Sequence, residues 1–116
     1  MMIEQTILDF LSERMPVPCY MAVPEQAPDH FIVLEKTGSS EDDGLHHSMF
    51  AVQSYGPRVE SGLYDAARLN EQVKDVLSDI PVLPEVSRCE VNTDYNFPDT
   101  TRKRPRYQAV FELVHY

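Results

Sequence analysis

The sequence predicts an α+β domain in which two helices pack on one face of a mainly antiparallel mixed sheet of about five strands, a two-layer sandwich. Two segments carry apolar residues at helical spacing, and five others are short and either apolar or alternating. The links between most of the expected strands are too short for a crossover helix, which favours hairpin pairing. We expect a single domain over residues 1–116, because a chain of 116 residues has room for one core of ordinary size.

The first helix is expected over residues 2–14. Its apolar residues recur at spacings of three and four: Ile3, Ile7, Leu8 and Leu11. Two prolines follow directly and end the helix, because proline has no amide proton to donate. Strands are expected at 19–23 and 31–37, joined by a turn-forming segment at 24–29. The second of these strands is β-branched, aromatic and apolar on both faces at its start, so we expect it to lie centrally in the sheet.

The segment 38–45 is polar, acidic and bounded by glycines, and we expect an exposed, mobile loop there. Another strand is expected over 47–55. The second helix is expected over 60–79, with Ser61 as its N-cap residue. Its apolar stripe is interpreted as core: Leu63, Ala66, Ala67, Val73, Val76, Leu77 and Ile80.

The last two strands are expected at 86–95 and 107–116, with a long hairpin tip between them at 96–104. The closing strand alternates, with one apolar face: Tyr107, Ala109, Phe111 and Leu113. The N-terminal residues contain no basic and apolar run typical of a secretory signal, and no apolar stretch approaches the ~20 residues that span a bilayer. We therefore expect a cytoplasmic protein, or one assembled in the cytoplasm.

The charge distribution is more informative than the total. The net charge is −9, which argues against a protein that grips nucleic acid by its phosphates. Four of the ten basic residues are Arg102, Lys103, Arg104 and Arg106, so the remainder of the chain carries −13. A basic spot on an acidic body suits docking against an acidic partner, including a second copy of the chain. Tyr95 and Phe97 lie close by in the sequence and could anchor such an interface.

Sites for catalysis, cofactors or metals are not predicted. No nucleophile-elbow, zinc-protease or phosphate-loop pattern is present, and no cofactor motif appears. Glu41, Asp42 and Asp43 with two following histidines, His46 and His47, are residue types that bind metals, but their spacing fits no metal motif, and a solvated acidic loop is the favoured interpretation.

The two cysteines, Cys19 and Cys89, are expected to be free and mostly buried thiols. The neighbours of Cys89 in its strand, Arg88 and Glu90, point to the opposite face and do not activate it.

Several stretches, in their order and spacing, resemble the tail terminator proteins of long-tailed (siphovirus-type) bacteriophages and prophages, a group of minor head–tail joining proteins. The resemblance covers essentially the whole chain, although no single motif in it is a catalytic signature. The stretches that carry it are 15–20, 23–28, 31–38, 50–56, 64–69, 95–99 and 104–108.

The resemblance implies a homo-oligomeric ring, usually a hexamer, that caps the finished tail tube and stops its polymerisation. The implied partners are further copies of the chain, the major tail tube protein and the head-completion or neck proteins, at the head-proximal end of the tail in the virion. The virion would be assembled in the cytoplasm of a host bacterium. DNA would pass through the lumen without specific binding, and six copies would carry about −54, six times the charge of one chain. A ring needs two different complementary patches. We expect the 96–106 hairpin and the 38–47 loop to supply them.

Three alternatives stay open from the sequence. A head-completion or neck protein of the same phage module can share a small α+β architecture. A small non-catalytic module that binds and regulates an enzyme would behave as a monomer at high concentration. A metal-dependent hydrolase built on the acidic loop would show metal-dependent turnover. The subunit number, and whether the free protein is a monomer, also stay open.

Overall fold

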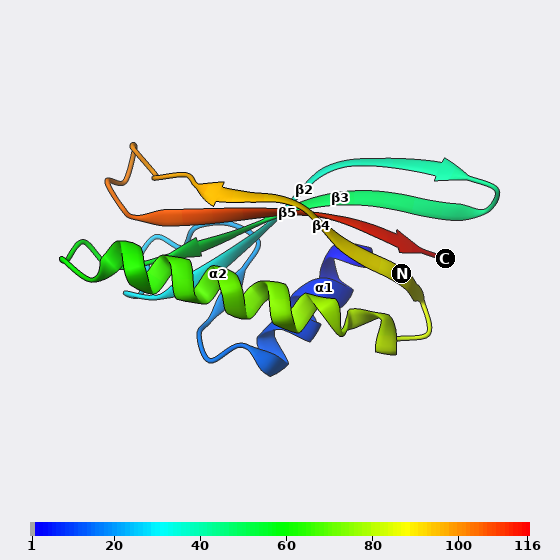
Figure 1. Ribbon diagram of the computed structural model, residues 1–116, viewed down its shortest axis with the longest axis horizontal. Helices are drawn as coiled ribbons and strands as arrows, with labels where there is room; N and C mark the ends of the chain where they lie inside the picture. Colours follow the sequence, from blue (N-terminus) through cyan, green and yellow to red (C-terminus); the bar gives the residue numbers. More distant parts are fainter. Residues whose placement is uncertain (1) are drawn as a thin grey trace.

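The computed structural model describes residues 2–116, and its centre is a five-stranded sheet with the order β1-β2-β3-β5-β4 (Figure 1). The strands are β1 (Cys19–Tyr20), β2 (Phe31–Asp42), β3 (Leu45–Tyr55), β4 (Val86–Asn96) and β5 (Arg106–His115). The helices are α1 (Ile3–Arg14), α2 (Gly62–Ser78) and a short 3-10 turn, η1 (Ile80–Val82). Only β1 and β2 pair in parallel, and every other pairing is antiparallel.

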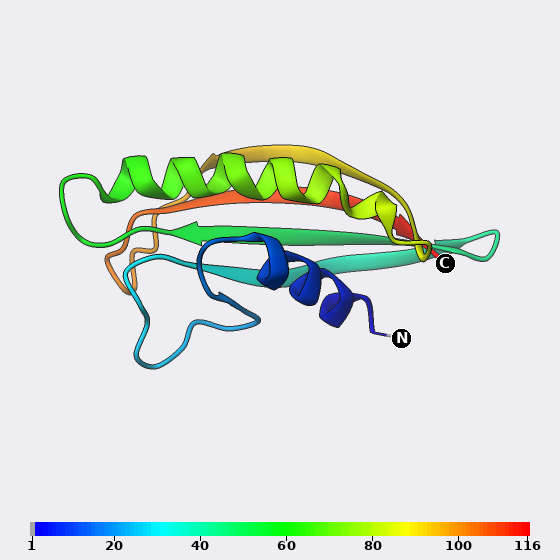
Figure 2. The same cartoon turned by 90° about the horizontal axis from the view of Figure 1, so that it is seen from below.

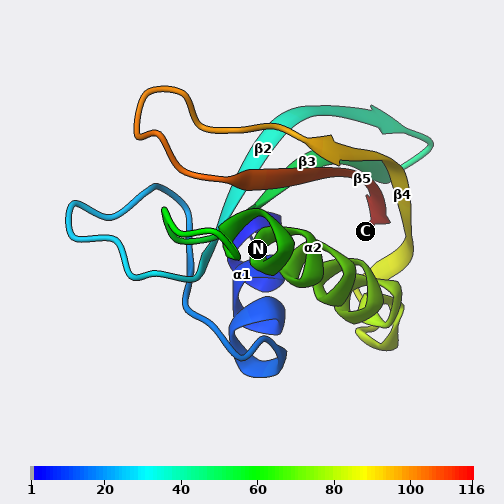
Figure 3. The same cartoon turned by 60° about the vertical axis from the view of Figure 1, so that its left-hand side comes forward.

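Both helices lie on the same face of the sheet, so the predicted two-layer α+β architecture is confirmed (Figure 3). We call this the inner face. Alternate residues of the central strands meet the helices there, as the sequence pattern predicted. The sheet contributes these buried residues: Ile32, Leu34, Phe50, Val52, Ala109, Phe111 and Leu113. The helices and η1 contribute these: Ile3, Ile7, Phe10, Leu11, Leu69, Val73, Leu77 and Ile80.

The opposite face of the sheet, the open face, carries no helix. Its apolar part is a second, smaller cluster of Phe31, Val33 and Tyr55 at one end of the sheet. The rings of Phe31 and Tyr55 stack with centroids 4.3 Å apart, and both side chains are fully buried. Tyr20, Val23 and Ala27, from the segment that links β1 to β2, pack against this cluster. Residues 31–34 are therefore buried on both faces, which confirms the expectation for the start of β2.

The prediction of a mobile loop at 38–45 is wrong. Strands β2 and β3 continue through it and form one long hairpin that projects beyond the rest of the sheet (Figure 2). Asp43 and Gly44 make the turn with φ of 51° and 79°. Positive φ at both central residues is typical of the type I′ turn, and Asp-Gly is its usual sequence. The charged residues around this pair obscured a turn signal that was present in the sequence.

The second helix is shorter than expected, and its buried stripe is rotated. Leu63 is 45% exposed, whereas Leu69 and Asn70 are buried. Gly62 occupies the first helical position because the carbonyl oxygen of Pro57 lies where a Cβ atom would be placed. Ser61 occupies the N-cap position, as expected, but its hydroxyl accepts no capping hydrogen bond from the first turn of the helix.

Two further boundaries differ from expectation. The first strand ends at Tyr20 rather than at 23, because the chain then turns away to cover the second cluster. Strand β3 begins at Leu45, two residues before the expected start, because the hairpin pairs up to its turn. No helix within residues 2–116 is long and apolar enough to cross a bilayer.

Candidate functional site

The basic hairpin tip is organised around one buried carboxylate, Asp99, which is 4% exposed. One carboxylate oxygen accepts hydrogen bonds from the backbone amides of Thr101 and Arg102 at 3.1 and 3.0 Å. The other accepts from the Tyr55 hydroxyl at 2.9 Å and from the Arg102 guanidinium at 3.1 Å. Burial by itself would raise the pKa of Asp99, but these hydrogen bonds and the charge of Arg106 outweigh it, and the net effect lowers that pKa.

Arg104, expected to be a docking residue, is tied into its own chain. Its Nε donates to the carbonyl oxygen of Gly56 at 2.8 Å. One terminal nitrogen donates to the carbonyl oxygens of Pro28 and Asp29 at 3.1 and 2.7 Å. The guanidinium also lies over the Phe31 ring, 5.3 Å from its centroid. These contacts hold together three segments that are far apart in the sequence, so Arg104 has a structural role.

Arg106 is similarly engaged, and its side chain is only 14% exposed. The guanidinium lies 4.4 Å from the centroid of the Phe97 ring and donates to the Phe97 carbonyl oxygen at 2.7 Å. It also donates to the Tyr55 hydroxyl at 3.0 Å. Burial is the largest influence on Tyr55 and raises its pKa. The expected basic patch is thus partly an internal network, which leaves Arg102 and Lys103 as its outward-facing members.

Lys103 takes a left-handed backbone conformation, with φ of 55°, at the apex of the turn. Asp99 and Arg104 bond across the base of the same turn through their backbone atoms, at 3.0 and 3.1 Å. This arrangement points the Arg102–Lys103 apex away from the sheet at one end of the molecule (Figure 1). The apex is therefore the part of the basic segment that a partner can reach.

Arg58 is a basic residue that the sequence interpretation missed. It lies in the exposed link between β3 and α2 and shares a groove with Arg102 and Arg104. Burial, followed by the positive charge of Arg58, lowers the pKa of Arg104, so the charges of these two guanidinium groups repel each other. In sequence, Arg58 stands forty-four positions or more from the other two arginines, and no local pattern connects them.

Tyr95 and Phe97, the expected apolar anchors, form an exposed pair beside this end of the open face. Their exposed fractions are 40% and 41%, and their rings meet edge to face with centroids 5.6 Å apart. The Tyr95 hydroxyl accepts a hydrogen bond from the Gln108 amide at 2.6 Å. Gln53 donates in turn to Gln108 at 2.9 Å. The aromatic pair is fixed to the sheet and has the character of a rigid contact surface.

The acidic residues Glu41, Asp42 and Asp43 stand at the other end of the long axis, at the tip of the β2–β3 hairpin (Figure 1). The molecule is elongated, with extents of 47 × 24 × 24 Å. Glu41 lies 3.5 Å from His46, its cross-strand partner. His47 is the neighbour of His46 along a strand and points to the opposite face. Among residues 2–116, no group of three or more histidine, cysteine or acidic side chains is placed to hold a metal ion.

Next to this tip lies a histidine pair that the sequence interpretation did not single out. The rings of His46 and His115 stack with centroids 5.2 Å apart. His115 is 7% exposed, and its Nε2 lies 2.9 Å from the Ser48 hydroxyl. Burial lowers the pKa of His115, and the nearby charges of His46 and Lys36 act in the same direction. Antiparallel pairing of β3 with β5 brings the two histidines together from positions 69 residues apart.

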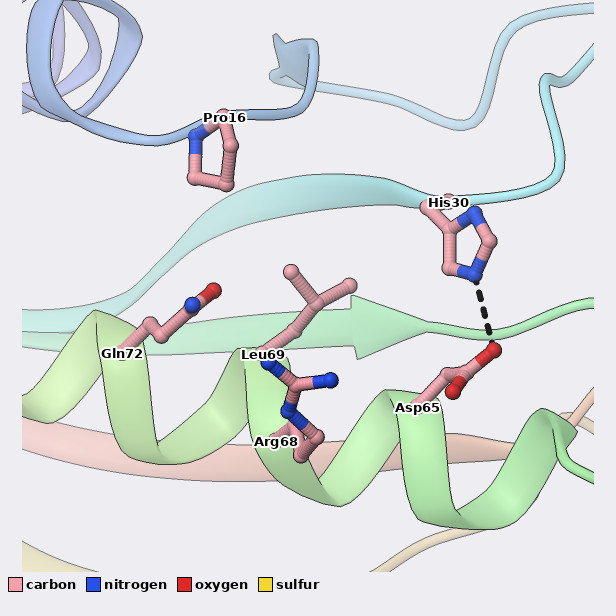
Figure 4. A pocket seen from close by; sticks show the side chains of 6 residues that line it. All are labelled: Pro16, His30, Asp65, Arg68, Leu69 and Gln72. Carbon is pink, nitrogen blue, oxygen red and sulfur yellow. Dashed lines mark hydrogen bonds and ion pairs between the residues drawn. The ribbon is translucent and has the colours of Figure 1, made fainter.

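A further groove lies between α2 and the start of β2 (Figure 4). His30 and Asp65 face each other across it, with Nε2 and Oδ2 2.9 Å apart. Asp65 lies in the first turn of α2, where a carboxylate is favoured by the helix dipole. Pro16, Arg68, Leu69 and Gln72 complete the lining without adding a nucleophile. We interpret the pair as a tie between the β1–β2 link and the helix.

Both cysteines are free thiols, as expected, but they are only partly buried. Burial raises the pKa of Cys19 to about 11 and that of Cys89 to about 12. Such thiols are protonated at neutral pH and are poor nucleophiles. Glu90 adds to the shift at Cys89, in agreement with the expectation that the flanking charges do not activate it.

Comparison with protein-family models and with the curated proteins finds no match for this chain. The residues and their geometry therefore carry the argument for function. They give two surfaces of opposite charge, an acidic hairpin tip and an arginine-rich end, which lie at opposite ends of one elongated subunit.

Proposed function

We propose that this chain is a structural protein of a long-tailed phage or prophage that assembles into a ring on the end of the tail tube. The ring, a hexamer by analogy with the family that the sequence resembles, would end tube polymerisation and offer a surface to the head-completion proteins. The observation that carries the proposal is the placement of opposite charges at the two ends of the long axis. A head-to-tail ring requires two different, complementary patches on every subunit.

The overall charge supports the same function. A ring on the tail tube surrounds the path of DNA, and a surface that repels phosphates prevents the DNA from sticking as it passes. One chain carries −9, and much of its basic charge is held in contacts within the subunit. This distribution is opposite to that of proteins that bind DNA tightly, which present a free basic face.

The uncovered face of the sheet supplies a surface for the other partners. Tyr95 and Phe97 protrude from one end of it, and exposed aromatic residues are enriched in protein interfaces. We assign this end of the open face to contacts with the major tail tube protein or the neck proteins. The assignment places the ring contacts and the tube contacts on different parts of the subunit.

The decisive experiment removes the gene from its phage or prophage and examines the particles by negative-stain electron microscopy. Tails longer than those of the parent are the expected result, because nothing stops tube growth. Complementation with the intact gene should restore the parental length. Tails of normal length without attached heads would contradict the proposal and identify a neck protein. Unchanged, infectious particles would contradict both assignments.

A further inference from the structure

The arginine-rich end contains a groove with an unusual balance of charge. The segment 23–27 and Phe31 line this groove together with Arg58, Arg102 and Arg104. Glu25 is the only acidic residue that lines it within the part of the chain described. Three guanidinium groups thus converge on one groove from two separate links of the fold.

These positive charges are poorly compensated inside the subunit. Within residues 2–116, neither Arg58 nor Arg104 forms an ion pair with a carboxylate. Arg102 pairs with Asp99, but this carboxylate is shared with Arg106 at 3.8 Å. The hydrogen bonds of Arg104 to carbonyl oxygens fix its position without cancelling its charge. A groove of this kind favours an anionic group that brings two or more carboxylates.

The same chain carries a group of matching charge. Asp42 and Asp43 are exposed at the tip of a narrow two-stranded hairpin, which is held rigid by cross-strand pairing up to Asp42 and Leu45. The hairpin projects from the opposite end of the 47 Å long axis, so it cannot reach the groove of its own subunit (Figures 1 and 2). It can reach the groove of a second copy.

We infer that the Asp42–Asp43 hairpin tip of one copy docks in the Arg58–Arg102–Arg104 groove of the next. The contact is heterologous, because the tip and the groove are different surfaces and each subunit keeps one of each free for further neighbours. It involves Arg58, which the sequence did not indicate, and gives Arg104 a second role beside its structural one. Lys103, at the outer rim, adds to electrostatic attraction rather than to the docked contact.

This inference rests on the proposed ring function and names the contact that links its subunits. The two can fail separately. Self-association of the purified chain tests the contact, whereas the length of tails in the deletion strain tests the function. If the purified chain associates through this contact but the deletion strain has tails of normal length, the proposed function is refuted and the contact is not.

The test uses two variants, each with one surface disabled. D42N/D43N removes the acidic tip, and R58Q/R102Q removes charge from the groove without touching Arg104. Sedimentation velocity at low ionic strength, in a buffer without phosphate, measures association over a range of protein concentrations. We expect the native chain to associate, and each variant alone to associate about tenfold more weakly or not at all. The association should also weaken as salt is raised.

Mixing the two variants is the sharpest step. The groove of D42N/D43N and the tip of R58Q/R102Q remain intact, so the mixture should form a dimer that cannot grow further. An interface that uses other surfaces would instead leave each variant associating like the native chain before mixing. A mixture that stays monomeric while the native chain associates would overturn the inference, and so would a native chain that is monomeric throughout.

Matched controls separate the contact from the change in charge. D75N/D79N alters the net charge by the same amount as D42N/D43N at exposed positions on α2 and just after it. It should associate like the native chain. The single variant R58Q removes an exposed side chain that forms no ion pair within residues 2–116, so its loss of association cannot be attributed to unfolding. Association of R58Q equal to that of the native chain would also contradict the inference.

Discussion

Asp99 connects the sheet to the arginine-rich turn through a set of bonds centred on one side chain. Its carboxylate is buried, yet it stays ionised because amide, hydroxyl and guanidinium donors surround it. Tyr55 reaches it from the end of β3, and Arg106 supports both residues from β5. A buried charge with several donors is stable only while all of them are in place.

Replacement of Asp99 by asparagine should therefore lower the free energy of unfolding by about 2 kcal/mol at pH 7. The folded-state pKa of Asp99 is lowered, so its stabilising contribution is present above the unfolded pKa of about 3.9 and is lost as pH falls through the folded value. Urea unfolding at pH 7 and pH 3 measures the difference between native chain and variant. The difference in free energy of unfolding between the native chain and Asp99→Asn should be smaller at pH 3. The variant D75N, at an exposed position, should have the stability of the native chain at both pH values.

The tip of the β2–β3 hairpin has a composition typical of a loop although it forms paired strands. Polar and acidic residues at 38–45 are typical of a loop, but strand pairing depends on backbone hydrogen bonds and tolerates exposed polar side chains. The turn is made by Asp43 and Gly44, whose positive φ values suit the right-handed twist of the strands. Beyond Lys36 strand β2 is exposed and pairs only with β3, whereas β3 also pairs with β5 as far as His46, so the stability of the β2 half depends on this turn and on the pairing with β3.

Hydrogen exchange should distinguish the hairpin from a mobile loop. Backbone amides paired between 39–41 and 46–48 should exchange more slowly than those of the exposed link at 24–27. The substitution Gly44→Val should raise the exchange rates in the hairpin, because a β-branched residue is strained at φ of 79°. Exchange at residues 50–54, which are buried in the centre of the sheet, should stay unchanged. Equal rates at 39–41 and 24–27 would contradict the hairpin.

The whole molecule is an elongated subunit whose two ends differ in charge and in construction. One end is a two-stranded projection with carboxylates at its tip, and the other is a group of links that arginine side chains hold together. Arg104 contributes most to that second end, because it bonds to the carbonyl oxygens of three residues from two other segments. Its planar guanidinium can reach them at once, which a lysine ammonium cannot do with the same geometry.

The substitution Arg104→Lys should separate geometry from charge. It keeps the positive charge but loses the branched set of hydrogen bonds, and we expect the free energy of unfolding to fall by about 2 kcal/mol. Lys103→Gln changes the charge at the next position and should alter stability by less than about 0.5 kcal/mol. Thermal unfolding of the two variants gives the comparison. If Arg104→Lys is as stable as the native chain, the charge of Arg104 contributes to stability and its branched hydrogen bonds do not.

The arginine cluster illustrates the limit of the sequence at this site. Residues 102–106 stood out by composition, and the structure places 102–104 in one turn and Arg106 at the start of β5. Contacts with Tyr55, Gly56 and Pro28 decide which of these basic residues are held inside the subunit and which are exposed at the apex. Arg58 joined the groove from another link. None of these partners is close enough in the sequence for a local pattern to indicate it.

The sequence by itself determined the presence and the chain order of the helices and strands and most of the inner-face core, because burial imposes a period of 3.6 or 2 residues that can be read locally. It also determined the acidic charge and the basic segment. Only the tertiary structure decided that the 38–45 segment extends the sheet, that Arg104 and Arg106 are internal ties, and that opposite charges occupy opposite ends. Those outcomes depend on strand pairing and on contacts between distant residues, whose energies belong to the folded chain as a whole.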